Sequence, residues 1–193
     1  MSTLRELKSR IGSVSSTEKT TSAMKMISSA KMHKFTSQLQ RLLPYRNMVQ
    51  GVIGHLLATD VEYSSPLINV REVKKVALVA FGSDDGLCGA FNIYVSKFLL
   101  KTLAATRQKF GANVAITIIP VGKKMAKALQ GIKNPDFEVR TVEGVNTRSN
   151  ANQLHDFTEL LRGCFLDGTY GQVSLVYMHV KSTSRQIPTC EQM

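Results

Sequence analysis

The 193-residue sequence has no tryptophan and only three cysteines, and this scarcity excludes several classes of protein. Cys88, Cys164 and Cys190 are odd in number and widely separated, which is typical of a reducing compartment and argues against a disulfide-bonded secreted domain. Cys88 has no neighbouring base in the sequence that would make it a catalytic thiol, and the four histidines lack zinc-site spacing. We therefore expect no catalytic set, no metal site and no cofactor.

Long hydrophobic runs and acidic residues are also scarce. No apolar run reaches about 18 residues, so the sequence predicts no membrane-spanning helix. Fourteen acidic side chains stand against 25 lysines and arginines, which gives a net charge of +11. Residues 1–58 hold nine basic side chains against Glu6 and Glu18, a net +7, while the other residues contribute +4. Such a balance favours an acidic partner: nucleic acid, anionic lipid or an acidic protein surface.

Residues 2–58 predict one long amphipathic helix. Ser2 or Thr3 can cap its start, with Glu6 completing a capping box. We expect Pro44 to interrupt or kink the helix. At 1.5 Å per residue it would be roughly 80 Å long, so its apolar stripe needs a partner. That stripe starts as a heptad seam, weakens near Thr21, and then resumes: Leu4, Leu7, Ile11, Val14, Met24, Ile27, Met32, Phe35, Leu39 and Leu42.

After a polar connector at residues 59–72, the hydrophobic period changes. Short apolar runs predict strands at residues 73–81, 114–121 and 137–142, with a last strand at 172–180. Helical patterns lie between them at 90–110, at 123–129 and from Asn150 or Asn152 to residue 165. Pro120 suggests that the second strand ends irregularly. The sequence therefore predicts an α/β protein, with a coiled-coil-type helix at 1–58 and a Rossmann-like open α/β domain at 73–193.

The stretch GSDDGLCGAFN, residues 82–92, follows the first predicted strand, where a doubly wound sheet places a ligand loop. Its glycines do not match G-x-G-x-x-G, and no Walker lysine follows. Asp84 and Asp85 would repel phosphate, and a pair of carboxylates without further ligands is a weak metal signal. We interpret the stretch as a structural turn built on Gly82, Asp84, Gly86 and Gly89.

Two other functions remain open from the residues alone. A basic helical nucleic-acid-binding protein with an α/β domain would use phosphate contacts, although the helix has few aromatics and its charges encircle it. A nucleotide-binding enzyme would use the α/β domain. Salt-dependent retention on DNA would favour the first, and saturable nucleotide binding the second.

Motifs along the whole chain resemble the gamma subunit of F-type ATP synthase. The start, STLRELKSRIGSVSSTEKTTSAMKMISSAKM, is similar to the N-terminal rotor helix of that family, with Thr20, Ser28 and Ser29 at positions where the family commonly has apolar residues. LPYRNMV, GSDDGLCGAFN, VGKK and STSRQIPT resemble later family motifs at the expected distances. Family members continue into a long helix that coils against the N-terminal one, whereas this chain stops at Met193.

The resemblance implies a non-catalytic central-stalk rotor subunit, which couples ion flow through the membrane sector to ATP synthesis or hydrolysis on other subunits. The implied partners are the alpha and beta catalytic hexamer, the epsilon subunit and the membrane ring of c subunits, without nucleic acid. It places five residues of the shaft helix against the stator: Lys19, Thr21, Met24, Lys25 and Lys31. Because Met1 stands directly before the shaft motif, we expect a bacterial protein without a presequence, peripheral on the cytoplasmic face of the plasma membrane.

The 82–92 stretch yields a first prediction: the α/β domain does not bind ATP or a dinucleotide, because both phosphate-binding fingerprints are missing. Calorimetry with either ligand at millimolar concentration should show no binding heat. A stoichiometric isotherm would contradict the interpretation of this stretch as a structural turn.

Overall fold

The computed structural model describes residues 3–58, 65–67, 72–132, 136–182 and 185–193. The chain divides into two compact units, Met1–Ser64 and Ser65–Met193. Most of the connector expected at 59–72 lies outside the described residues.

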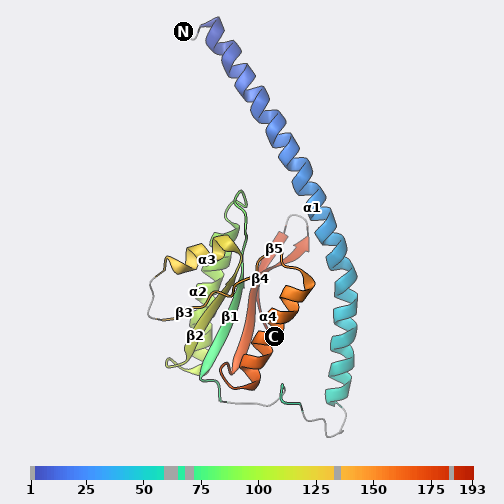
Figure 1. Cartoon of the computed structure of the whole chain (residues 1–193), viewed down its shortest axis with the longest axis vertical. Coiled ribbons are helices and arrows are strands. Elements are labelled where there is room, and N and C mark those ends of the chain that lie inside the picture. The colour runs from blue at the N-terminus through green and yellow to red at the C-terminus, as the bar shows by residue number, and fades with distance from the viewer. Residues whose placement is uncertain (1–2, 59–64, 68–71, 133–135, 183–184) are drawn as a thin grey trace. The chain divides into compact units, whose positions relative to one another are not determined.

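The first unit is a single helix, α1, from Leu4 to Ala58 (Figure 1). Its start has the expected capping box: the Thr3 N–H donates to Glu6 Oε2 at 2.8 Å, and the Glu6 N–H donates to Thr3 Oγ1 at 3.4 Å. The helix continues through Pro44, so the expectation that Pro44 interrupts it is wrong, while the alternative, a kink at Pro44, stays a prediction. Proline frees one carbonyl a turn earlier, and in this exposed helix water can satisfy it.

None of the described residues of α1 is buried. The predicted seam is open to solvent, with Leu4 75% and Ile11 68% exposed. An isolated helix gains little from burial and depends on its weak intrinsic propensity. The first unit therefore has a regular backbone but no core of its own.

The second unit contains a five-stranded sheet in the order β3-β2-β1-β4-β5 (Figure 1). Strands β1 (Lys75–Phe81), β2 (Ala115–Val121), β3 (Glu138–Val139) and β4 (Gln172–Ser182) are parallel, and β5 (Arg185–Gln192) pairs antiparallel with β4. Three helices connect the parallel strands: α2 (Phe91–Phe110), α3 (Lys123–Gln130) and α4 (Ala151–Leu166). The predicted α/β fold class is confirmed.

Both faces of the central strand β1 are covered. Val76, Leu78 and Ala80 pack in one apolar cluster with residues of α2 and α3. Ala77 and Val79, which point to the other face, pack in a second cluster with residues of α4. Alternate residues of one strand thus serve two cores, which explains why its sequence is a continuous apolar run.

The sheet differs from the sequence prediction at both edges. Residues 185–192 form β5, so the strand at 172–180 is not the last one, and the prediction there is wrong. Pro188 and the polar residues of β5 gave no strand signal, but an edge strand tolerates both. At the other edge, β3 has only two paired residues, whereas the sequence predicted a strand over 137–142.

Pro120 lies within β2, opposite Ala80 of β1. The Arg140 N–H donates to the Ile118 carbonyl at 2.9 Å, so Pro120, two residues further on, faces the same side of β2. Strand β3 pairs only with Thr117 and Ile118 and has ended at that level. The missing N–H of Pro120 therefore removes no bond from the ladder with β1 or β3.

Two glycines, Gly82 and Gly122, lie in a tightly packed place where the end of β1 meets α3. A Cβ added to Gly82 would lie 2.5 Å from Met125 Cβ, and one added to Gly122 would lie 2.8 Å from the Gly82 carbonyl oxygen. Met125 is fully buried, so it has no room to move away. Gly86, in the same turn, has open space around it and no left-handed φ.

These two glycines make a matched pair for a stability test. Gly82→Ala should destabilise the domain by about 1–3 kcal/mol, because the added methyl group overpacks a buried contact. Gly86→Ala should be neutral or stabilising by up to about 1 kcal/mol, through the unfolded chain. The stabilities of the two variants are compared by urea unfolding. Equal midpoints would show that the contact at Gly82 does not affect the free energy of unfolding.

The lack of burial in α1 predicts uneven hydrogen exchange. In the chain by itself, amides of α1 should exchange much faster than those of β1, because no packed surface resists local opening of the helix. Mass spectrometry of exchanged peptides measures both regions in one sample. Equal, strong protection in a proven monomer would be inconsistent with a helix that lacks a core.

Candidate functional site

The five residues expected to face a stator all lie on α1 and are exposed. At 3.6 residues per turn, Thr21, Met24, Lys25 and Lys31 fall within about 120° of the helix circumference, whereas Lys19 lies on the opposite side. The structure therefore brings four of the five onto one face. Met24 is 44% exposed and stands among small and cationic side chains.

The threonines of this region turn their hydroxyl groups inward, which sequence reasoning did not find. Oγ1 of Thr17, Thr20 and Thr21 donates to the carbonyl four residues earlier, at 2.9, 3.0 and 2.8 Å respectively. A threonine hydroxyl has one hydrogen, so these three groups have no donor left for an outside partner. They offer a partner methyl groups and oxygen lone pairs.

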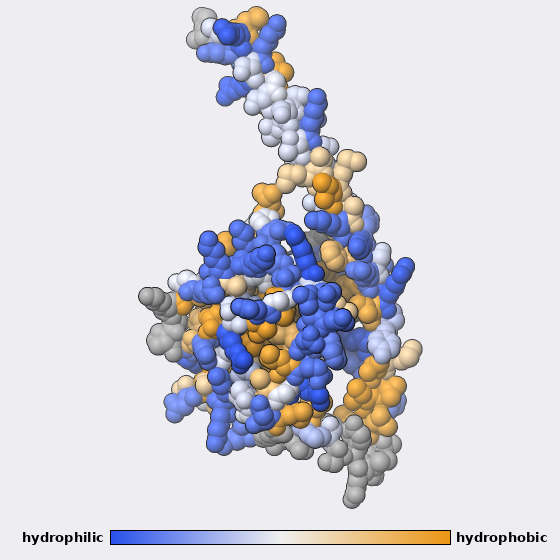
Figure 2. Space-filling view, in the orientation of Figure 1, coloured by the Kyte–Doolittle hydropathy of each residue, from blue (hydrophilic) through white to orange (hydrophobic). Residues whose placement is uncertain are grey.

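The charge on α1 is dispersed. Its nine basic side chains, against two acidic ones, are distributed from Arg5 to Arg46, and residues 47–58 carry no lysine, arginine or acidic side chain. Hydrophilic and apolar residues are interspersed on the face of α1 seen in Figure 2. A positive field of this kind attracts acidic surfaces without one strong anchoring point.

The second candidate region is the turn that follows β1. The Ser83 N–H donates to Asn92 Oδ1 at 3.0 Å, and Asn92 Nδ2 donates to Ser83 Oγ at 2.7 Å, which ties the turn to the start of α2. Gly89 has a φ of 55°, in the left-handed region. Leu87, also left-handed, is 90% exposed.

The Asp84 side chain connects this turn to two distant segments of the α/β domain. Its carboxylate accepts the Lys123 N–H at 2.8 Å and the Thr147 N–H at 2.9 Å, and it also accepts the Thr147 hydroxyl. Partial burial raises the pKa of Asp84, but the hydrogen bonds from Thr147 and Lys123 outweigh it and leave the pKa below the ordinary value. Its partners come from segments 39 and 63 residues away in the sequence, and no local pattern predicted these contacts.

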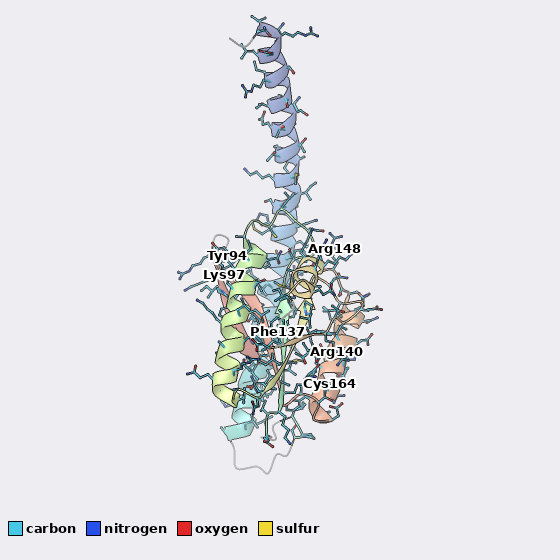
Figure 3. The ribbon with its side chains drawn as sticks, turned by 90° about the vertical axis from the view of Figure 1, so that its left-hand side faces the viewer. Tyr94, Lys97, Phe137, Arg140, Arg148 and Cys164 are labelled. Atoms are coloured by element: carbon cyan, nitrogen blue, oxygen red, sulfur yellow. The ribbon has the colours of Figure 1, made fainter. Side chains whose placement is uncertain are left out.

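Asp85 lies beside Asp84 but has a different partner. Arg148, labelled in Figure 3, donates from its guanidinium to Asp85 Oδ2 at 2.5 Å, and both side chains are largely exposed. Within the described residues, no group of three or more histidine, cysteine or acidic side chains could hold a metal ion. The two carboxylates thus bond to protein groups of the neighbouring loops.

The helices of the described part of the chain do not combine the length and hydropathy that crossing a bilayer requires. The longest of them, α1, carries charged residues from Arg5 to Arg46.

Comparison with known proteins identifies relatives along the whole chain. The family model described as ATP synthase matches residues 3–193. The ATP synthase gamma chain of Bacteroides thetaiotaomicron is 40% identical over 188 residues, which cover 97% of this chain and 61% of that protein. The gamma chain of Phocaeicola vulgatus is 36% identical over 192 residues, which cover 99% of this chain and 65% of that protein.

A solved structure shows the same fold. The central stalk and c-ring structure of Tetrahymena thermophila mitochondrial ATP synthase contains a chain that matches 89% of this one, with a TM-score of 0.59 and 23% identity, over 70% of its own length. The present chain spans less than two thirds of the length of the curated relatives named above. From the family match and these identities, the chain belongs to the ATP synthase gamma-chain family.

Proposed function

We propose that this chain is the central-stalk rotor subunit of an F-type ATP synthase and couples ion flow to catalysis on other subunits. The observation that carries the proposal is α1, a 55-residue helix with none of its described residues buried. A helix of this length with an exposed apolar seam requires partners to cover it. Membership of the gamma-chain family supports the choice of partners proposed below.

A rotor shaft must be held by its surroundings without being fixed at one angle. A few deeply buried contacts would favour a single orientation strongly. Dispersed lysines instead provide a screened attraction that changes gently with angle. The inward-turned hydroxyls of Thr17, Thr20 and Thr21 fit this requirement, because they cannot donate angle-specific hydrogen bonds to a stator.

The proposed stator contacts are Lys19, Thr21, Met24, Lys25 and Lys31, inside the bore of the alpha and beta hexamer. Because a bore surrounds the shaft, Lys19 can serve on the opposite side from the other four. Flexible methionines such as Met24 accommodate several packings as the angle changes. The epsilon subunit and the ring of c subunits complete the proposed assembly, which lies peripherally on the cytoplasmic face of a bacterial plasma membrane.

We propose no catalytic role for the chain. Asp84, the best-connected carboxylate of the turn after β1, accepts hydrogen bonds from Lys123 and Thr147. A carboxylate bound in this way has a lowered pKa, which makes it a poor general base at neutral pH. The work of the chain is mechanical, and the ATP chemistry belongs to its partners.

The shaft proposal predicts the effect of Met24→Lys in the gamma chain of an assembled ATP synthase. The new cation would be attracted to acidic groups of the bore by on the order of 1 kcal/mol when partly desolvated. This attraction would favour some angles over others. ATP hydrolysis should be reduced less than ATP-driven proton pumping, because the catalytic residues on other subunits remain intact. Both rates are measured on the same vesicles.

Met24→Leu is the matched control, because it keeps an apolar side chain of similar size and adds no charge. Its ratio of pumping to hydrolysis should equal that of the wild type. A wild-type ratio for Met24→Lys as well would show that position 24 is not part of the coupling contact.

A further inference from the structure

We propose that Asp84 is a positioning residue whose carboxylate holds three loops of the α/β domain together at the carboxyl edge of the sheet. This inference concerns the construction of the domain and is independent of the rotor function. We call the arrangement the carboxylate clasp, which consists of Asp84, the Lys123 N–H and the N–H and hydroxyl of Thr147.

The clasp joins the segments that follow three neighbouring strands. Asp84 comes three residues after the end of β1, Lys123 comes two residues after the end of β2, and Thr147 lies in the segment between β3 and α4. Since the strands are parallel, all three segments start at the same edge of the sheet. One side chain thus connects positions 39 and 63 residues away in the sequence.

The segment after β3 has little other support from the sheet. Strand β3 pairs with β2 through only two residues, Glu138 and Val139. An N–H that donates to a carboxylate forms a stronger bond than one that donates to a neutral acceptor. The clasp therefore supplies, through Thr147, part of the attachment that a longer third strand would have provided.

The clasp also occupies the edge where doubly wound α/β domains bind their ligands. The Lys123 N–H belongs to the first residue of α3, and such amides are satisfied by caps or bound anions. In this chain the acceptor is the protein's own carboxylate. At this edge the clasp thus holds the loops to one another and leaves the Lys123 N–H already bonded.

The charges around Asp84 favour its ionised form. Lys123 on α3 lowers its pKa by Coulombic attraction, after the larger effects of burial, which raises it, and of the hydrogen bonds, which lower it. Asp85 on the same turn is a like charge, and Arg148 pairs with it. Because the folded-state pKa lies below the unfolded one, the clasp's contribution is complete above about pH 3.9 and is lost as pH falls through the folded-state value.

The clasp is tested by the exchange rates of the two amide hydrogens that donate to Asp84. In the full chain, Asp84→Ala should accelerate exchange at Lys123 and Thr147 by roughly tenfold or more, since a bond to a charged acceptor is lost at each. Amides of β1 and β2 should change little. Residue-resolved NMR measures all of them in one experiment, and unchanged rates at both positions would overturn the proposal.

Asp85→Asn is the matched control: it removes the neighbouring carboxylate and its pair with Arg148, and should leave the Lys123 and Thr147 amides at wild-type rates. If Asp84→Ala does not fold, the wild-type protein supplies a second test. Its Lys123 and Thr147 amide shifts should titrate together, with one midpoint below the ordinary aspartate pKa of about 3.9. Separate midpoints, or no titration, would likewise overturn the clasp.

Discussion

Burial of apolar surface holds one unit of this chain together and is missing from the other. In the α/β unit, the residues Val76–Ala80 of β1 are at most 1% exposed and pack against helices on both faces of the sheet. In α1, no described residue is buried, and the large apolar side chains other than Leu43 are exposed. The α/β unit can therefore fold around its own core, whereas α1 needs surfaces supplied by partners.

This division fits the rotor function proposed for the chain. The α/β unit is stiffened by two cores and by the carboxylate clasp between loops that follow β1, β2 and β3. Helix α1 has a long exposed surface with dispersed cations and with threonine hydroxyls already bonded to its own backbone. A stiff body and a surface without strong anchoring points are what a rotating coupling element requires.

The polar residues of α1 have a different meaning in the structure than in the sequence. In the sequence, Thr17, Thr20 and Thr21 interrupt the apolar seam of α1. They suggest that the contact made by this seam is partly hydrated. In the helix, each hydroxyl donates to a carbonyl one turn earlier, which removes the only hydrogen it could offer to a partner. Serine or threonine in place of an apolar residue therefore reduces the apolar surface that α1 offers to a partner. It adds few directional hydrogen bonds to that partner.

The sequence by itself determined the long helix, its capping box, the parallel strands β1, β2 and β4, and the family, because these depend on local periodicity and contiguous motifs. It did not reveal β5, whose proline and polar residues are tolerated only because the strand lies at the edge of the sheet. Nor did it reveal why Pro120 fits inside β2, which depends on where β3 ends. The partners of Asp84 likewise come from segments 39 and 63 residues away, and only the packing of parallel strands brings them to one edge. Helices, strands and motifs follow from residues that are neighbours in the sequence, whereas contacts between distant loops depend on the tertiary structure.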